Sequence, residues 1–216
     1  MNRLKYNTRL LLAGFAFAGL IISCASQPRE LPDEITREIP ATPEYIMGEG
    51  RLPAEQMALF LTLNNPNLDM DFALMIANLY IEEAAKEGVN HDVAFAQMSL
   101  ETGFMAFGNL VSPEQNNFAG LGATGLPGPD GLPERGIYFP DARIGVRAHI
   151  QHLKAYASTE PLNQELVNPR FHIVERFVGR GIAPTIQGLT GRWATDPLYC
   201  QKIATILSRM YYFSFG

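Results

Sequence analysis

The alternation of apolar and polar positions predicts a chain built mainly of helices. Two long stretches, residues 72–86 and 197–213, repeat apolar residues at helical spacing. Residues 54–63, 142–156 and, as a single turn, 185–189 are further expected helices. In the two long stretches the inward positions are Leu74, Ala77, Tyr80, Ile81, Ala84, Tyr199, Ile203, Ile206, Leu207 and Met210.

A helix expected after Asn90 differs from these because it is apolar nearly all round. Asn90 is a suitable N-cap, and Asp92 complements the positive end of the helix dipole. Between residues 93 and 100 only Gln97 and Ser99 are polar. A helix without a polar face is buried, so this element is expected at the centre of the fold.

Capping residues set the other helix boundaries. Asp69 or Asp71 is expected to cap the helix over residues 72–86, with Gly88 as its C-terminal cap. Asp141 is expected to cap the helix over residues 142–156. Asp196 followed by Pro197 predicts a helix start with proline at the first helical position.

Residues 126–136 are rich in glycine and proline, which predicts a loop or hairpin. Residues 137–139 (Ile-Tyr-Phe) are expected to form a short strand beside it. The predicted fold class is therefore mainly α, in the α+β sense, with a small β-hairpin region.

The N-terminus predicts export. Three basic residues precede an apolar run over residues 10–22, which is short for a transmembrane helix and suits a signal peptide. The sequence Ile-Ile-Ser-Cys at 21–24 resembles a bacterial lipoprotein cleavage box, so residues 1–23 are expected to be removed and Cys24 lipidated. An ordinary signal peptide or an uncleaved anchor are the alternatives. The predicted location is the cell envelope, anchored to a membrane through lipid and directed to the outer membrane if the host has one.

Residues 24–53 contain five prolines among scattered charges and are expected to form an extended tether, with the folded domain over residues 54–216. With Cys24 acylated, Cys200 has no cysteine partner, so no intramolecular disulfide is expected.

The charge balance argues against a nucleic-acid partner. The chain has a formal net charge of −5, and without residues 1–23 it retains 14 basic and 22 acidic residues, a formal charge of −8. An acidic domain is not attracted to an anionic polymer, so binding to a cell wall would depend on local contacts with the sugars.

Glu101 is the strongest candidate for chemistry. It lies at the end of the expected buried helix, one turn after Gln97 and Met98. Burial penalises a charged carboxylate and raises its pKa, which suits a general acid near neutral pH. A loop follows at residues 116–122 that contains amides, glycines and an aromatic side chain. These groups are suited to binding a sugar.

Four motifs in order resemble the glucosaminidase domain of bacterial cell-wall hydrolases, glycoside hydrolase family 73. They are AQMSLETG at 96–103, NNFAGLG at 116–122, RAHIQHL at 147–153 and WATDPLY at 193–199. The resemblance covers about residues 56–213, and Asn168–Phe171 also resembles a turn of the family. It implies a lysozyme-like fold, peptidoglycan glycan strands as substrate, and cleavage of the β-1,4 bond between N-acetylglucosamine and N-acetylmuramic acid.

The resemblance also implies site residues. Glu101 matches the catalytic acid, and Tyr199 matches a tyrosine facing the cleft, a catalytic helper. A second catalytic carboxylate would come from the small β region, and Glu134 is chosen over Asp130 and Asp141. The alternative is that Glu134 is a solvated loop residue. In that case the substrate acetamido group could take the place of the second carboxylate. The sugar sites are expected to be lined by Asn117, Phe118, Gly120, Tyr138 and Trp193, although Trp193 could equally pack in the core.

No cofactor is expected. His149 and His152 lie one turn apart, but no third ligand stands at a matching position, so no metal site is predicted. A monomer is expected. Two other functions remain open: a lytic transglycosylase that uses the same single acid, and a non-catalytic lipoprotein that binds the cell wall.

Overall fold

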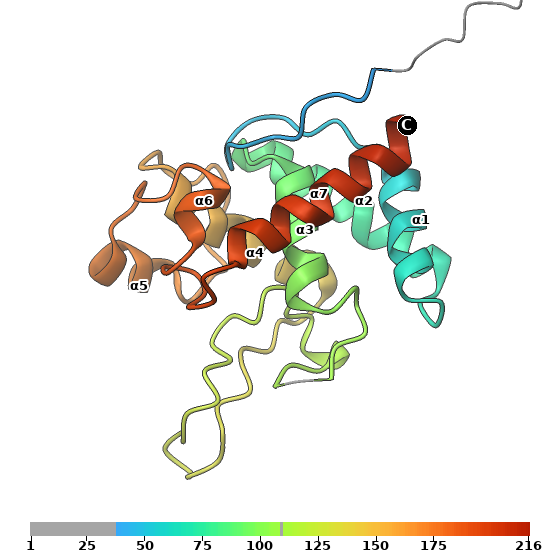
Figure 1. The fold of residues 1–216 in the computed structure, drawn as a ribbon. Helices are drawn as coiled ribbons and strands as arrows, with labels where there is room; N and C mark the ends of the chain where they lie inside the picture. Colours follow the sequence, from blue (N-terminus) through green and yellow to red (C-terminus); the bar gives the residue numbers. More distant parts are fainter. Residues whose placement is uncertain (1–37, 109) are drawn as a thin grey trace, which may run out of the picture. The chain divides into compact units, whose positions relative to one another are not determined.

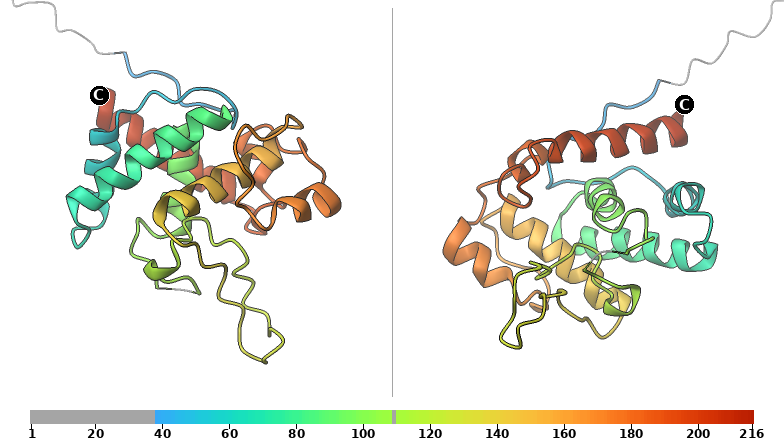
Figure 2. Two further views of the ribbon diagram at one scale, coloured as in Figure 1. Left: turned by 180° about the vertical axis from the view of Figure 1, so that it is seen from behind. Right: turned by 60° about the horizontal axis from the view of Figure 1, so that its bottom comes forward.

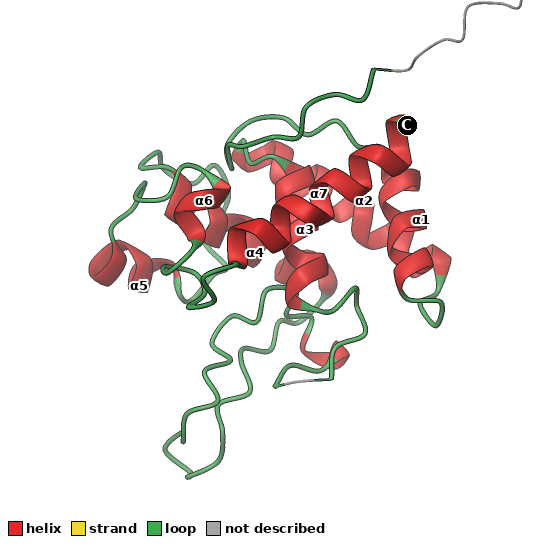
Figure 3. Ribbon diagram, viewed as in Figure 1, coloured by secondary structure: helices red, strands yellow, loops and turns green. Residues whose placement is uncertain are grey.

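Helices make up the regular structure of the protein, as Figure 1 shows. The computed structural model describes residues 38–108 and 110–216. Figure 3 draws these residues as helices and loops without a strand. The helices are α1 (Ala54–Asn64), α2 (Met70–Glu87), α3 (His91–Glu101), the 3-10 turn η1 (Pro113–Gln115), α4 (Ala142–Ala157), α5 (Phe171–Ile173), the π-helical turn η2 (Val174–Val178), α6 (Ile186–Leu189) and α7 (Tyr199–Phe215). The mainly-α prediction is confirmed.

α3 is the central helix. It packs against α2, α4 and α7, and Figure 1 shows α7 crossing in front of it. Eight of its eleven residues are buried, as expected for a helix without a polar face. The left view in Figure 2 shows the long loop between α3 and α4 extending below the helices. The C-terminal end of α3, which carries Glu101, therefore opens onto this loop.

Capping by short polar side chains sets several boundaries as predicted. Asn90 accepts hydrogen bonds from the backbone N–H groups of Asp92 and Val93 at the start of α3. Asp69, rather than Asp71, caps α2, and Asp141 caps α4. Gly88 ends α2 in the left-handed conformation, with φ of 72°, that glycine adopts without steric cost.

The predicted start of the last helix is wrong. α7 begins at Tyr199, and Leu198 precedes it without a side-chain cap. Asp196 instead accepts a hydrogen bond from the backbone N–H of Leu198 and pairs with Lys202 Nζ. A bond to the residue two positions on closes a turn, so residues 196–198 lead into the helix rather than form its first turn.

The strand predicted at residues 137–139 is also wrong, since this segment is irregular. Its backbone bonds go to two separate places: Ile137 donates to the carbonyl of Leu121, and Phe139 to that of Gln115. The adjoining hairpin, residues 125–134, is held by a few backbone bonds and one isolated bridge between Pro127 and Pro133. Proline has no N–H to donate, so a ladder cannot extend along these residues.

Part of the stretch predicted as tether lies against the helices. Ile46 is fully buried, and Leu52 is nearly so. The backbone N–H of Ile46 donates to the carbonyl of Pro184, and the carbonyl of Ile46 accepts from the backbone N–H of Asn90. The folded unit therefore begins before Ala54, because buried apolar side chains and paired backbone groups hold the preceding segment in place.

Asp92 fixes the same segment from inside the fold. Its buried carboxylate accepts from the backbone N–H groups of Arg51 and Leu52 and from the hydroxyl of Tyr211. Its role is therefore larger than the dipole contact expected from the sequence.

The predicted signal peptide, the lipidation site Cys24 and the first part of the tether lie outside the described residues. Within the described residues, none of the helices combines the length and the apolar character needed to traverse a bilayer.

Candidate active site

Glu101 is the last residue of α3, and the backbone reverses direction immediately after it. Thr102 is buried and accepts a hydrogen bond from the backbone N–H of Met105 while donating to the carbonyl of Met98. Phe104, Met105 and Phe107 have positive φ angles between 53° and 64°, a region that residues other than glycine seldom occupy. This turn ends the helix at the carboxylate and leads the chain to the residues that surround it.

The two oxygens of the Glu101 carboxyl group have different surroundings. Oε1 accepts hydrogen bonds from the Tyr199 hydroxyl and from Nε1 of Trp193, the latter at 3.1 Å. Oε2 faces Gly120, where a Cβ would stand 3.9 Å away. Because Oε1 is occupied by two donors, Oε2 is the oxygen able to carry a proton toward the cavity beside Gly120.

Burial raises the pKa of Glu101, and the hydrogen bonds from Tyr199 and Trp193 oppose this without cancelling it. The direction is the one expected from the sequence. A carboxyl group with a raised pKa retains its proton closer to neutral pH, which is what a general acid requires.

A chain of buried hydrogen bonds supports Glu101 from behind. Gln97 Nε2 donates to the Tyr199 hydroxyl at 2.8 Å, and Gln97 Oε1 contacts His149 Nε2 at 2.9 Å. His149 Nδ1 in turn contacts the Tyr80 hydroxyl at 2.8 Å. Because the Gln97 oxygen can only accept, His149 carries its proton on Nε2, and every donor in the chain points toward Glu101.

Two titratable members of this chain, His149 and Tyr199, are held neutral. Burial lowers the pKa of His149 to about 3, with a smaller contribution from His152. Burial also raises the pKa of Tyr199 well above its usual value, and the nearby charge of Glu101 raises it further. Tyr199 therefore remains a hydrogen-bond donor to Glu101 across the physiological pH range.

Two cavities of about 200 Å³ each adjoin this site. The first, here called the acid cavity, is lined by Glu101, Thr102, Phe107, Leu110, Val111, Asn117, Gly120 and Ala123. The second, here called the arginine cavity, is lined by residues 119–124 together with His152, Tyr156, Arg170, Arg192 and Trp193. They share Gly120 and Ala123, so both open along one loop. Glu101 is the one carboxylate among the described residues that line either cavity.

The structure brings Glu101, Tyr199, Trp193, Gly120 and Asn117 together. Asn117 is almost fully buried, and its side chain bonds to the backbone of Leu121 on both its oxygen and its nitrogen. Its amide therefore shapes the loop that borders the acid cavity. Gly120 has a φ of 62° and no side chain, which keeps the space in front of Oε2 open.

Three other predicted site residues lie elsewhere. Phe118 is buried in the hydrophobic core, so it supports the loop from beneath. Tyr138 is two-thirds exposed and lines neither cavity. Glu134 is exposed in the hairpin, accepts a hydrogen bond from Thr124 Oγ1 at 2.7 Å, and lines a separate hollow formed by residues 128–135.

Several contributing residues were not identified from the sequence as members of the site. The sequence identifies Gln97 only as a helical neighbour of Glu101, and it considers His149 only as a metal ligand, which it rejects. Tyr80 was assigned to an apolar stripe. Their partners are 52 to 102 residues away in the chain, and helical spacing carries no information on such contacts.

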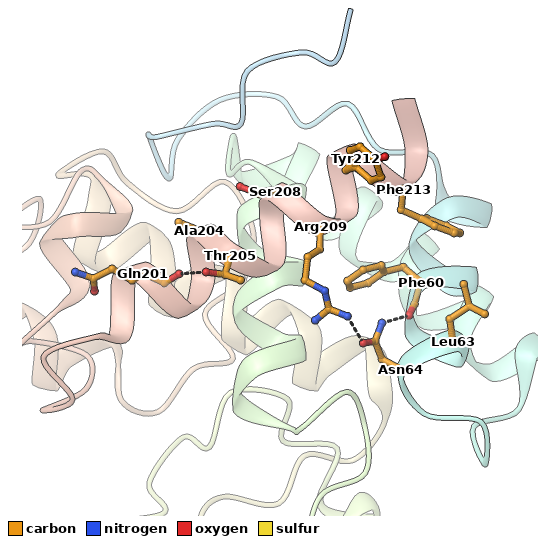
Figure 4. Close-up of a pocket in the computed structure, with 10 residues that line it drawn as sticks. All are labelled: Phe60, Leu63, Asn64, Gln201, Ala204, Thr205, Ser208, Arg209, Tyr212 and Phe213. Carbon is orange, nitrogen blue, oxygen red and sulfur yellow. Dashed lines mark hydrogen bonds between the residues drawn. The ribbon is translucent and has the colours of Figure 1, made fainter. Parts of the chain in front are cut away.

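A larger cavity, of about 880 Å³, lies between α1 and α7 (Figure 4). Its walls include Phe60, Leu63 and Phe213, and Arg209 reaches across it to bond with Asn64. No carboxylate stands among the described residues that line it. It therefore lacks the groups needed for acid catalysis, in contrast to the smaller acid cavity.

A carboxyl group with a raised pKa, at the end of a buried helix and facing a polar cavity, is the arrangement that an acid-catalysed glycosidase requires. Comparison with known proteins supports this class. A family model described as "Glucosaminidase: Mannosyl-glycoprotein endo-beta-N-acetylglucosaminidase" matches residues 77–212. The chain belongs to this glucosaminidase family, which makes it a glycoside hydrolase and supports activity on peptidoglycan.

The chain is also similar to an uncharacterized protein of Borreliella burgdorferi. The two are 40% identical over 195 residues, which cover 89% of this chain and 91% of that protein. No solved structure matches the chain.

Proposed function

We propose that the protein is an endo-β-N-acetylglucosaminidase that cleaves the β-1,4 bond between N-acetylglucosamine and N-acetylmuramic acid in peptidoglycan, with Glu101 as the general acid. Family membership supports the substrate class. The observation that carries the assignment of Glu101 is its asymmetric environment: two donors on Oε1 and open space at Oε2.

In the first step, Glu101 Oε2 gives its proton to the glycosidic oxygen as the bond from that oxygen to the anomeric carbon breaks. The leaving muramyl unit departs with a free hydroxyl, and Glu101 becomes a carboxylate. The hydrogen bonds from Tyr199 and Trp193 stabilise this charge in a partly buried site.

The nucleophile that attacks the anomeric carbon is proposed to be the substrate's own acetamido oxygen. It bonds to that carbon as the leaving group departs. Water then opens the resulting ring, and its proton returns to Glu101, so the enzyme is restored. The lack of a second carboxylate among the described residues lining either cavity supports this choice over Glu134. This route retains the β configuration at the anomeric carbon.

The central experiment digests purified peptidoglycan with wild type, Glu101→Gln and Glu134→Gln. General acid catalysis contributes roughly 10²–10⁴-fold, so Glu101→Gln should lose at least about 100-fold of the rate. Glu134→Gln should retain its rate. The control Glu55→Gln removes an exposed carboxylate from α1 and should behave like wild type.

Mass spectrometry and proton NMR of the products then test the reaction. A reducing N-acetylglucosamine end with retained configuration is expected. An anhydro-muramic end would instead identify a lytic transglycosylase. Binding to sacculi without fragment release, unchanged by Glu101→Gln, would identify a non-catalytic wall-binding protein. Inversion of configuration would contradict the acetamido route and require another base.

We also propose that the protein is exported and anchored to a membrane through lipid on Cys24, as the motif at residues 21–24 suggests. Cells supplied with labelled palmitate should incorporate label into wild type and not into Cys24→Ala. Equal labelling of both proteins would contradict the proposal.

A further inference from the structure

The arginine cavity contains positive charge that the proposed cleavage does not use. Arg170 and Arg192 both line it, and no carboxylate stands among the other described residues of its lining. Residues 119–124 of the loop before α4 complete its lining, with His152, Tyr156 and Trp193. A cavity lined by two arginines and no acidic residue is suited to an anion.

Neither arginine forms an ion pair within residues 38–108 and 110–216. Among the described residues, the Arg192 side chain donates a hydrogen bond only to the carbonyl of Gly188, a neutral acceptor, at 3.1 Å. Arg143 and Arg147, by contrast, both pair with the buried Glu83 and tie α4 to α2. The arginines of the cavity therefore keep their donors available for a ligand.

Aromatic rings form a firm wall beside these arginines. The rings of His152 and Tyr156 pack against Trp193 with centroid distances of 4.9 Å and 5.5 Å. The Tyr156 hydroxyl donates to the backbone carbonyl of Arg192, and the Asn168 amide contacts His152 Nδ1. These bonds fix the wall and hold the backbone of Arg192 against it.

His152 does not add charge to the cavity at neutral pH. Burial lowers its pKa to about 3, with a further contribution from the positive charge of Arg170. The positive charge in this part of the site therefore comes from the two arginines.

Trp193 joins the arginine cavity to the catalytic acid. Its ring lines the arginine cavity while its Nε1 donates to Glu101 Oε1. Gly120 and Ala123 line both cavities. The two cavities therefore adjoin each other at these two residues.

We propose that the arginine cavity binds a carboxylate carried by the muramyl unit that adjoins the bond cleaved at Glu101. This inference rests on the proposed glucosaminidase function. The carboxylate has two chemical sources: the lactyl group of a muramyl unit without a peptide, or the peptide stem when one is attached. In either case the site supplies local attraction that an acidic chain as a whole does not provide.

The test compares the intact protein with Arg170→Gln, Arg192→Gln and the double variant. Glutamine keeps hydrogen-bonding capacity and removes the charge. The substrates are peptidoglycan with stems, strands freed of stems, and stem-free strands whose lactyl carboxylates are converted to neutral amides. Arg176→Gln is the matched control, since Arg176 is exposed and lines neither cavity.

For the double variant, KM should rise about tenfold or more on the carboxylate-bearing substrate, with kcat nearly unchanged. The amidated strands should show no difference between wild type and variants. A rise in KM on stem-bearing material alone assigns the carboxylate to the stem, and a rise on stem-free strands assigns it to the lactyl group.

Unchanged KM on both carboxylate-bearing substrates, or an equal rise on the amidated strands, would overturn the inference. Calorimetric binding of a muramyl disaccharide and of its amide, in the Glu101→Gln background, gives a readout that does not need turnover. Loss of preference for the acid form in the double variant supports the site, and equal binding of both forms by the parent protein refutes it. A wild type that binds the acid form but releases no fragments would contradict the proposed function alone.

Discussion

At the scale of single residues, the site depends on how Glu101 is surrounded rather than on its presence alone. The sequence allowed Glu101 to be predicted as an acid with a raised pKa, because a carboxylate at the end of an apolar helix is desolvated. It did not allow the order of donors to be predicted. That order arises from Gln97, His149 and Tyr199, which come from three different helices.

Replacing Glu101 by Gln should stabilise the fold at neutral pH while removing activity. The folded-state pKa of Glu101 is raised, so its contribution to stability is complete below the unfolded pKa and is lost as pH rises through the folded value. At pH 7–8 the variant should gain on the order of 1 kcal/mol, or about 2–4 °C in Tm.

The measurement is thermal unfolding of wild type and Glu101→Gln from pH 4 to pH 8. The difference should shrink toward pH 4, where the wild-type carboxyl group is mostly protonated in both states. A gain that is equal at all pH values would show that burial of charge is not its cause.

Replacing Tyr199 by Phe should move the alkaline limb of the pH–rate profile to higher pH. The Tyr199 hydrogen bond lowers the pKa of Glu101, so its removal lets burial raise that pKa further. The variant should also lose about 1–3 kcal/mol of stability, because the buried Gln97 amide loses its acceptor.

The pH dependence of kcat/KM and urea denaturation test this variant. Tyr212→Phe, an exposed position on the same helix, is the control and should change neither quantity. An alkaline limb that stays in place or moves to lower pH would contradict the role given to the Tyr199 hydroxyl.

At the scale of elements, the helices were predictable because their signals are local. Asn90, Gly88 and Asp141 act within a few residues of their positions in the chain, and each functions as expected. The strand at 137–139 was not predictable in the same way. Its apolar residues suit a strand, but its backbone partners come from two different segments, at Leu121 and Gln115.

Gly145 shows how an element fits against the active-site loop. A Cβ at this position would stand 1.8 Å from the carbonyl oxygen of Asn116, so α4 approaches the loop more closely than any side chain allows. In an ordinary helix, Gly→Ala stabilises by roughly 0.5–1 kcal/mol. Here Gly145→Ala should have the opposite sign.

The expected loss for Gly145→Ala is about 2 kcal/mol or more, with reduced activity because the 116–122 loop must shift. Chemical denaturation and the rate on peptidoglycan measure the two effects. A stabilised variant with full activity would show that α4 and the 116–122 loop can move apart without loss of stability.

At the scale of the whole molecule, the boundary of the folded unit depends on contacts between distant segments. Proline content suggested a tether up to Pro53, and composition cannot reveal that Ile46 and Leu52 are buried against helices. The Asp92 carboxylate, which was readable only as a dipole partner, holds this segment through two backbone N–H groups.

A chain that starts at residue 54 should therefore be less stable than one that starts at residue 38. The shorter chain exposes the apolar helix surface against which Ile46 packs. It also removes the backbone N–H groups of Arg51 and Leu52, which donate to the buried Asp92 carboxylate. The expected loss is about 3 kcal/mol or more. Urea unfolding of the two truncated proteins measures it, and equal midpoints would show that residues 38–53 contribute nothing to the fold.

The protein contains one tryptophan among its 216 residues, and that side chain donates to the Glu101 carboxylate and lines the neighbouring cavity. The tryptophan emission of the protein therefore comes from a single place in the molecule. Ligand arrival, ionisation of Glu101 and loss of the surrounding aromatic packing each alter the light that it emits. The enzyme thus carries an intrinsic optical probe, and occupancy of its cleft can be followed in real time without attaching a dye.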